Sequence, residues 1–257
     1  MAISKSYKSI FVVSLGCLLS LNLGVLPGST NVSSQSDNVP SQGLPGRRLG
    51  GGTRGPEVSG YTPQRPLIAL MPETNLGVTT AAYPRFLFYL PNADGIREVE
   101  YVLRNEADEL VYETTVSVSS SSGLFSIDLS SVEGLTPLQL NENYRWYFSI
   151  VADDRSQDVS VDGWTRRVDL HTWIEEQALP SDLATRLAVA PPLEKAKILY
   201  QEAYLWHDAA LLLEDLYQAN PHDKTVSTEW FRLLEAVDLA ELNSASTVRV
   251  SVVATVN

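Results

Sequence analysis

Alternation of apolar and polar residues runs through residues 67–170 and constrains the fold of this chain more than any other feature. In residues 143–151 four large side chains fall on one face of a strand: Tyr144, Trp146, Phe148 and Ile150. Further strands are predicted at Leu67–Met71, Phe86–Leu90, Glu98–Arg104, Leu110–Val118, Leu124–Leu129 and Val159–Leu170. Because short turn signals such as Asn92–Gly95 separate them, we expect antiparallel hairpins in a β-sandwich.

Tyr144 opens its predicted strand and follows Leu138 and a short polar turn. This is the arrangement of a tyrosine corner, in which the tyrosine hydroxyl binds a backbone group upstream. The sequence therefore predicts an α+β protein whose residues 61–170 form an immunoglobulin-like or fibronectin III-like sandwich, with a structural role for Tyr144.

After Leu170 the apolar period becomes that of an α-helix, and residues 171–243 are predicted as a helical subdomain docked against the sheets. Helices are expected at Trp173–Ala178, Asp182–Val189 and Thr225–Leu239, with a helical hairpin over residues 191–221. Asp208 is predicted to cap the second hairpin helix, after a turn at His207. The hairpin resembles one tetratricopeptide repeat at five positions: Leu193, Ala196, Tyr200, Ala209 and Pro221.

The first 30 residues have the pattern of a secretory signal peptide, because Lys5 and Lys8 precede an apolar run over Ile10–Leu26. A membrane span and lipidation at Cys17 are the alternatives. A cleaved signal implies an exported protein, in the periplasm, outside the cell or in the cell envelope, with no membrane span and no cysteine left.

The chain has 31 acidic and 19 basic residues, a formal net charge of −12. That balance argues against general affinity for nucleic acid or anionic lipid. Residues 31–60 are predicted as a disordered linker rich in Ser, Gly and Arg. Its glycines do not form a phosphate loop, because Gly52 stands where the lysine is required. We expect Arg47, Arg48 and Arg54 to meet carboxylates of this protein or of a partner.

The C-terminal segment, residues 244–257, returns to strand-like alternation. An edge strand of the sandwich or a frayed tail is the simpler interpretation. The functional alternative is a strand donated to a partner's sheet.

Few residues suggest catalysis or metal binding. The histidines, His171, His207 and His222, are not spaced as ligands, and no G-x-S-x-G elbow is present. The carboxylates of one predicted loop are weak calcium or catalytic candidates: Asp153, Asp154, Asp158 and Asp162. Solvated charges partnered by Arg155 are the alternative, and no cofactor or metal is predicted.

Trp164, Arg166 and Arg167 lie on the last predicted strand of the sandwich. Trp164 and Arg166 share a face, whereas Arg167 points the other way. An aromatic and arginine face suits a sugar or a protein hot spot. Cover by the helices is the structural alternative.

Several long motifs occur in order: GLPGRRLGGGTRG, PLIALMPETNLGVTTAAYPRFLFYLP, NYRWYFSIVADDRSQDVSVDGWTRRV and YQEAYLWHDAALLLEDL. Together they resemble DUF928, an exported cyanobacterial family known only as a domain of unknown function. The resemblance covers about Gly43 to Leu239 and implies no activity. It also implies that Glu57 and Ala152 stand where many relatives have cysteines, so that this chain has lost a disulfide.

Two functions remain open from the sequence. The first is a noncatalytic envelope protein that binds another protein or a surface polymer. The second is a hydrolase that acts on cell-wall or exported glycan through the carboxylates of residues 153–162. The sequence does not predict an oligomeric state.

Overall fold

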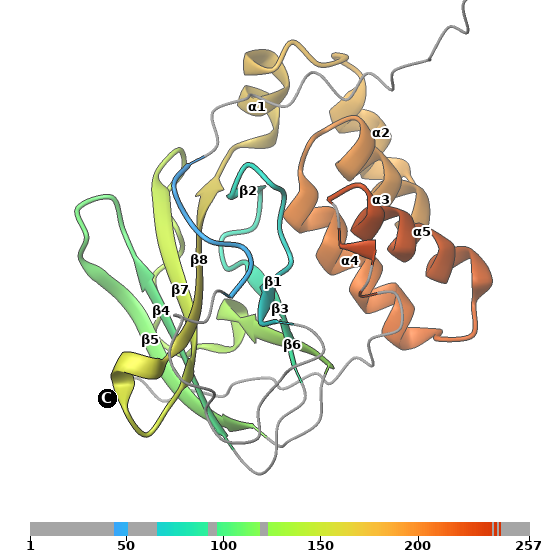
Figure 1. Cartoon of the computed structure of the whole chain (residues 1–257). Helices are drawn as coiled ribbons and strands as arrows, with labels where there is room; N and C mark the ends of the chain where they lie inside the picture. The colour runs from blue at the N-terminus through green and yellow to red at the C-terminus, as the bar shows by residue number, and fades with distance from the viewer. Residues whose placement is uncertain are drawn as a thin grey trace, which may run out of the picture. The chain divides into compact units, whose positions relative to one another are not determined.

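The computed structural model describes residues 44–50, 66–91, 97–118, 123–237, 239–240 and 242, all within one compact unit, Asn38–Asn257 (Figure 1). Several sequence predictions lie outside the described residues. These are the signal peptide at 1–30, lipidation at Cys17, the role of Arg54, the cysteine position at Glu57 and the tail at 244–257.

The fold of the described residues is mixed α+β, with eight strands in two sheets. The strands are β1 (Ile68–Ala69), β2 (Leu76–Thr79), β3 (Arg85–Leu90), β4 (Arg97–Arg104), β5 (Leu110–Val118), β6 (Gly123–Asp128), β7 (Asn143–Val151) and β8 (Val159–Arg167). The smaller sheet has the order β1-β3-β6 and the larger has the order β2-β8-β7-β4-β5.

The seven strands expected from alternation are present, and the short β2 is an additional strand. It pairs in parallel with β8, placing Leu76 beside Trp164 and Thr79 beside Arg167. The other pairings are antiparallel. The sequence pattern did not predict β2, because this strand has only four residues and its pairing partner lies far away in the sequence.

Aromatic side chains join the inner faces of the two sheets. The ring of Phe88 on β3 stacks on that of Phe148 on β7, with 4.0 Å between ring centroids. The ring of Phe86 contacts those of Tyr101 and Trp146 of the larger sheet, with 5.4 and 6.1 Å between ring centroids. Burial of this cluster contributes to the stability of the fold.

The hydroxyl of Tyr144 binds a backbone group upstream, as the tyrosine-corner pattern predicts. It accepts a hydrogen bond from the Gln139 N–H at 2.9 Å and donates to Glu142 Oε2 at 2.9 Å. The corner fixes the chain between β6 and β7.

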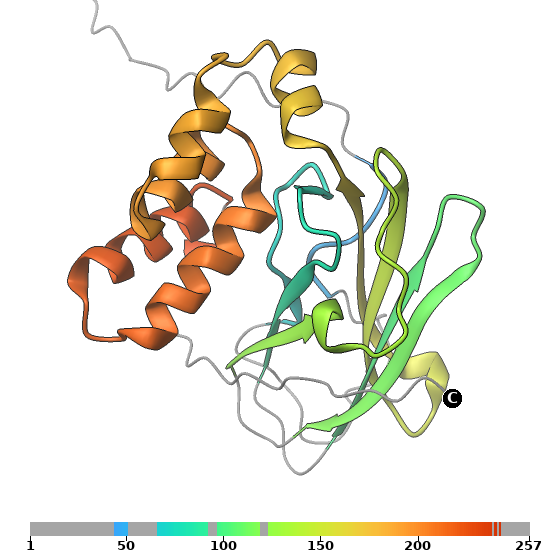
Figure 2. The same ribbon diagram turned by 180° about the vertical axis from the view of Figure 1, so that it is seen from behind.

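Five helices follow the strands: α1 (Leu170–Glu176), α2 (Leu183–Val189), α3 (Pro192–Gln201), α4 (Trp206–Ala219) and α5 (Lys224–Glu235). Asp169 caps α1 and Asp223 caps α5, each through a side-chain oxygen that accepts backbone N–H groups. In both ribbon views the helices lie on the side of β2 and the smaller sheet, and β4 and β5 lie on the far side (Figures 1 and 2). Helix α4 contacts both β2 and β3.

The predictions for His207 and Asp208 were wrong. Helix α4 begins at Trp206, so both residues lie inside it, and Asp208 does not cap the helix. His207 is buried against Gly77 of β2 and Phe86 of β3. The Asp208 carboxylate accepts hydrogen bonds from the Thr79 hydroxyl and from the backbone and side chain of Thr80. The two residues therefore attach α4 to the end of β2.

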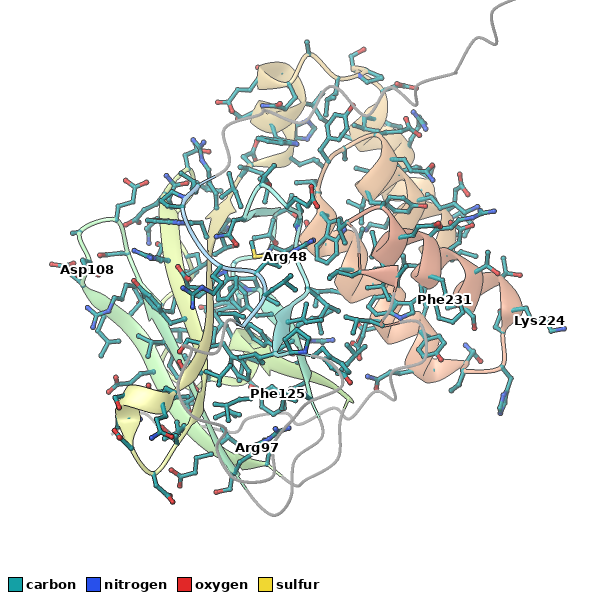
Figure 3. All side chains as sticks on the ribbon, viewed as in Figure 1. Arg48, Arg97, Asp108, Phe125, Lys224 and Phe231 are labelled. Atoms are coloured by element: carbon teal, nitrogen blue, oxygen red, sulfur yellow. The ribbon has the colours of Figure 1, made fainter. Side chains whose placement is uncertain are left out.

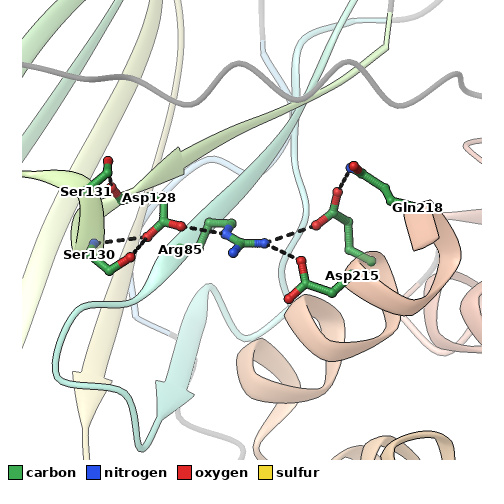
Figure 4. A network of polar contacts seen from close by, with 7 residues as sticks. Arg85, Asp128, Ser130, Ser131, Asp215 and Gln218 are labelled. Carbon is green, nitrogen blue, oxygen red and sulfur yellow. Dashed lines mark hydrogen bonds and ion pairs between the residues drawn. The ribbon is translucent and has the colours of Figure 1, made fainter.

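Arg85 of β3 forms a polar connection between the smaller sheet and α4 (Figure 4). Its guanidinium binds Asp128 at 3.1 Å, Glu214 at 3.2 Å and Asp215 at 2.8 Å. The Glu214 side chain is only 1% exposed, so Arg85 compensates a carboxylate that has lost most of its hydration.

Candidate functional site

Residues 44–50 lie within the segment predicted as a linker, and they pair with both sheets. Arg47 forms an antiparallel bridge with Asp162 of β8, with both N–H···O distances 3.0 Å. Leu49 forms a bridge with Ile68 of β1. Since paired residues in an antiparallel bridge point to the same side, Arg47 lies on the outer face of the larger sheet, with Asp162.

Arg48 points the opposite way, into the protein, and its side chain is 13% exposed. Figure 3 labels Arg48 among the side chains. The Arg48 guanidinium donates to the Met71 carbonyl at 3.2 Å and to the Val237 carbonyl, and it lies 3.7 Å from Glu73. Arg48 therefore has a structural role, because its contacts join residues 44–50 to the segment after α5.

Successive side chains of β8 point to opposite faces of the larger sheet, and this separates the predicted site residues of the strand. Gly163 and Thr165 are buried on the inner face, whereas Trp164 and Arg166 are partly exposed on the outer face. Arg167 points inward and donates a hydrogen bond to the Leu138 carbonyl at 2.7 Å, beside the tyrosine corner. The structure thus brings Arg47, Trp164 and Arg166 to one face and separates Arg48 and Arg167 from it.

Arg145 of β7 completes this outer face. It is paired in register with Trp164, and its guanidinium carbon lies 5.5 Å from the Trp164 ring and 4.9 Å from the Tyr147 ring. The Asp162 carboxylate binds Arg145 at 2.8 Å and raises the pKa of that guanidinium. We call the set Arg47, Arg145, Tyr147, Trp164 and Arg166 the arginine–tryptophan face.

Two guanidinium groups of this face have no carboxylate partner among the described residues. Within the described part of the chain, the Arg47 and Arg166 side chains make neither an ion pair nor a hydrogen bond. Arg166 lies on β8 four residues beyond Asp162, the partner of Arg47, a separation of about 13 Å along a strand. Trp164 lies between them, and its indole N–H donates to the Pro45 carbonyl at 2.8 Å.

Sequence reasoning did not identify Arg145 and Tyr147 as residues of the candidate site. Both occupy outward positions of Asn143–Val151, a strand whose inner face was predicted from its large apolar residues. A correct register for the β7–β8 hairpin would have placed Arg145 beside Trp164.

Two carboxylates of the segment 153–162, Asp154 and Asp158, have structural partners within their own loop. Asp154 caps the 3₁₀ helix η2 (Arg155–Gln157) by accepting from the Ser156 hydroxyl at 2.8 Å and from the Ser156 N–H at 3.0 Å, and these two bonds lower the pKa of its carboxyl group. Asp158 accepts from the Ala152 N–H at 2.9 Å and pairs with Arg155 at 3.0 Å. Asp153 is exposed. Throughout the described ranges, no three His, Cys, Asp or Glu side chains gather as a metal site would require.

The other histidines lie apart from this loop. His171 is exposed in α1, and His222 is exposed in the turn before α5. None of the helices in the described residues is both long and apolar enough to cross a membrane.

Comparison with known proteins identifies the family. The model of the Domain of Unknown Function (DUF928) matches residues 49–247, and the chain belongs to this family. No curated protein matches the chain. The chain is also similar to the crystal structure of a family 76 glycoside hydrolase from a bovine Bacteroides thetaiotaomicron strain, with 11% identity and a TM-score of 0.24. That match covers 62% of this chain and 36% of the hydrolase chain, and a score this low supports neither a shared fold nor a shared activity.

Proposed function

We propose that this protein is an exported, noncatalytic envelope protein that binds an acidic protein or an acidic surface polymer through the arginine–tryptophan face. The observation that carries the proposal is the pair of guanidinium groups on either side of Trp164, Arg47 and Arg166, which have no carboxylate partner in the described part of the chain. In the same proposal, the scaffold is an immunoglobulin-like sandwich, and the α3–α4 hairpin is related to a tetratricopeptide repeat.

Charge supports an anionic partner. Among the described residues the Arg47 and Arg166 guanidinium groups have no carboxylate partner, so their positive charges are available to an anionic group. Arginine also matches carboxylate, phosphate and sulfate groups through paired N–H donors. Because salt screens charges beyond roughly 8 Å at physiological ionic strength, a local arginine cluster attracts an anion despite the negative net charge.

The aromatic residues support binding of an extended partner. Tyr147 and Trp164 hold the Arg145 guanidinium over their rings, which orders this side chain before a ligand arrives. Tryptophan, tyrosine and arginine are the residues most often found at the energetic centre of protein interfaces. A preordered set of this kind binds with a smaller loss of side-chain entropy.

The alternative, a glycan hydrolase that uses residues 153–162, has weaker support. Asp154 and Asp158 hold the backbone of their own loop through the bonds described above. A general acid or base needs a carboxyl group directed at a substrate. The binding proposal needs no carboxyl group directed at a substrate, because it uses the arginine and aromatic side chains of the outer face.

The proposal is tested by binding to soluble polymers of known charge. The purified protein is titrated with polygalacturonate, poly-L-glutamate and neutral dextran at low and physiological salt. We expect saturable binding to at least one acidic polymer, no binding to dextran, and weaker binding as salt rises. Preference for polygalacturonate indicates a glycan partner, and preference for poly-L-glutamate indicates a protein partner.

The double variant Arg47→Gln/Arg166→Gln is expected to lower the affinity about tenfold or more, since two charge-assisted contacts are lost. Arg155→Gln is the matched control, because Arg155 is an exposed arginine that pairs with Glu100 and Asp158 outside the face. Equal binding by the double variant and the control would contradict the proposal, as would equal binding of dextran.

A further inference from the structure

Strand β5 ends the larger sheet, and its outer edge is unpaired among the described residues. It pairs with β4 on one side, and no other strand, turn or loop backbone in the described ranges bonds to it. The strand also lies on the far side of the molecule from the helices (Figures 1 and 2). Since alternate residues of an edge strand direct their N–H and C=O groups outward, this edge can accept a further strand.

The edge has few of the features that usually prevent such pairing. The strand Leu110–Val118 contains neither Pro nor Lys, and Glu113 is its single charged residue. A bulge at Val111 interrupts the register with β4, but only near the start of the strand. From Tyr112 to Val118 the register is regular, and exposed residues alternate with more buried ones. The stretch 112–118 is therefore a regular template for a partner strand.

A second copy of the same stretch is complementary to this template. If two such strands pair antiparallel around a twofold axis at Thr115, the middle of the stretch, every residue of 112–118 has a partner. Facing residues lie on the same side of the joined sheet. The facing pairs are Glu113 with Ser117 and Thr115 with itself on the outer face, and Tyr112 with Val118 and Thr114 with Val116 on the inner face.

This register avoids the faults of its neighbours. An axis at Glu113 would set two glutamates opposite each other, and like charges in facing positions destabilise a pair of strands. An axis at Thr114 would bring the bulge at Val111 into the new ladder. An axis between two residues would place inward side chains opposite outward ones. The axis at Thr115 faces no like charges and uses the whole regular stretch.

We propose that this protein forms a dimer in which two β5 strands pair antiparallel around a twofold axis at Thr115, so that the two larger sheets become one. Backbone hydrogen bonds supply the contact, as in other cases of strand addition. Pairing also covers Thr114 and Val116, which are half-buried in the single chain. Because an edge-to-edge contact is small for a protein interface, we expect a dissociation constant of roughly 10–100 μM. The interface does not depend on the proposed function of the arginine–tryptophan face.

Sedimentation equilibrium of the full chain, at concentrations below and above this range, tests the inference. The mass of wild type should rise from monomer to dimer. Thr115→Lys and Thr115→Glu each place two like charges across the axis, and each should weaken the dimer about fivefold or more. An equimolar mixture of the two variants should dimerise at least as tightly as wild type, since Lys then faces Glu. Val189→Lys, which adds the same charge at a position that is 78% exposed on α2, is the matched control and should dimerise as wild type does.

A further variant tests the register. Ser117→Lys places an ammonium opposite Glu113 of the partner subunit and should strengthen the dimer about threefold. Circular dichroism checks that each variant folds. A wild-type monomer at all concentrations, an unchanged dimer in Thr115→Lys, or a mixture of the Lys and Glu variants that stays monomeric would overturn the inference. A dimer that forms only after removal of residues 244–257 would also overturn it, because the edge would then belong to the chain's own C-terminal segment.

Discussion

Acid should destabilise this protein through one buried histidine. His207 lies inside α4 against Gly77 and Phe86, and burial lowers its pKa from 6.5 to about 4. The folded state therefore holds the neutral imidazole, whereas the unfolded chain gains a proton as soon as the pH falls below about 6.5. Stability from this group is complete above that pH and is lost as the pH falls toward about 4.

The size of the effect follows from the same values. The difference between the two pKa values corresponds to about 3 kcal/mol, most of which is lost between about pH 7.5 and about pH 4.5. Asp208 acts in the opposite direction, because desolvation raises the pKa of its carboxyl group. Its protonation in the folded state favours the fold as the pH falls, so a variant of His207 is needed to isolate the histidine.

Urea unfolding at the two pH values provides the measurement. The free energy of unfolding of wild type should fall by about 2–3 kcal/mol more than that of His207→Gln, whose side chain does not titrate. His171→Gln, which changes an exposed histidine, should retain the wild-type pH dependence. If His207→Gln does not fold, the imidazole proton resonance of wild-type His207 should titrate near pH 4. A midpoint near 6.5, or equal acid loss in wild type and His207→Gln, would refute the reasoning.

Two further predictions concern the attachment of α4 to the sheets. Gly77→Ala would place a methyl carbon 1.7 Å from the His207 Nε2 atom, so unfolding in urea should show a loss of about 1–3 kcal/mol, and unchanged stability would contradict this close approach. Arg85→Met removes the cation beside the buried Glu214 and should cost about 2–3 kcal/mol, whereas Arg186→Met, in a more exposed pair, should cost less than about 1 kcal/mol. Equal losses would show that burial does not determine the cost.

Local periodicity was sufficient for most of the fold. The bounds of β5 and β7 agree with the predicted segments, because their apolar residues alternate over nine positions. β2 has only four residues and pairs in parallel with a strand distant in sequence, so no local pattern identifies it. Its existence depends on β8 and on contact with α4.

The start of α4 illustrates a different limit. Asp208 is a good capping residue, and that preference suggested a helix starting after it. In the structure the Asp208 carboxylate binds Thr79 and Thr80 instead, and Trp206, Ala209 and Leu213 are buried on one side of the helix. Bonds between distant segments outweighed the local preference.

The candidate site was predicted only in part. Trp164 and Arg166 were placed on a common face by the period of a strand, and the structure agrees. The directions of the Arg47 and Arg48 side chains could not be predicted from alternation, since glycines surround these residues. Their opposite directions are fixed by the bridges of Arg47 to Asp162 and of Leu49 to Ile68.

Those two bridges also have a consequence for solubility. Asp162 of β8 lies beyond the end of β2, and Ile68 belongs to the outermost strand of the smaller sheet. Without residues 44–50, both positions would present unpaired backbone groups to which a strand from another molecule could be added. The short arginine-containing segment therefore protects two sheet edges from intermolecular association, while one of its arginines remains directed toward the solvent.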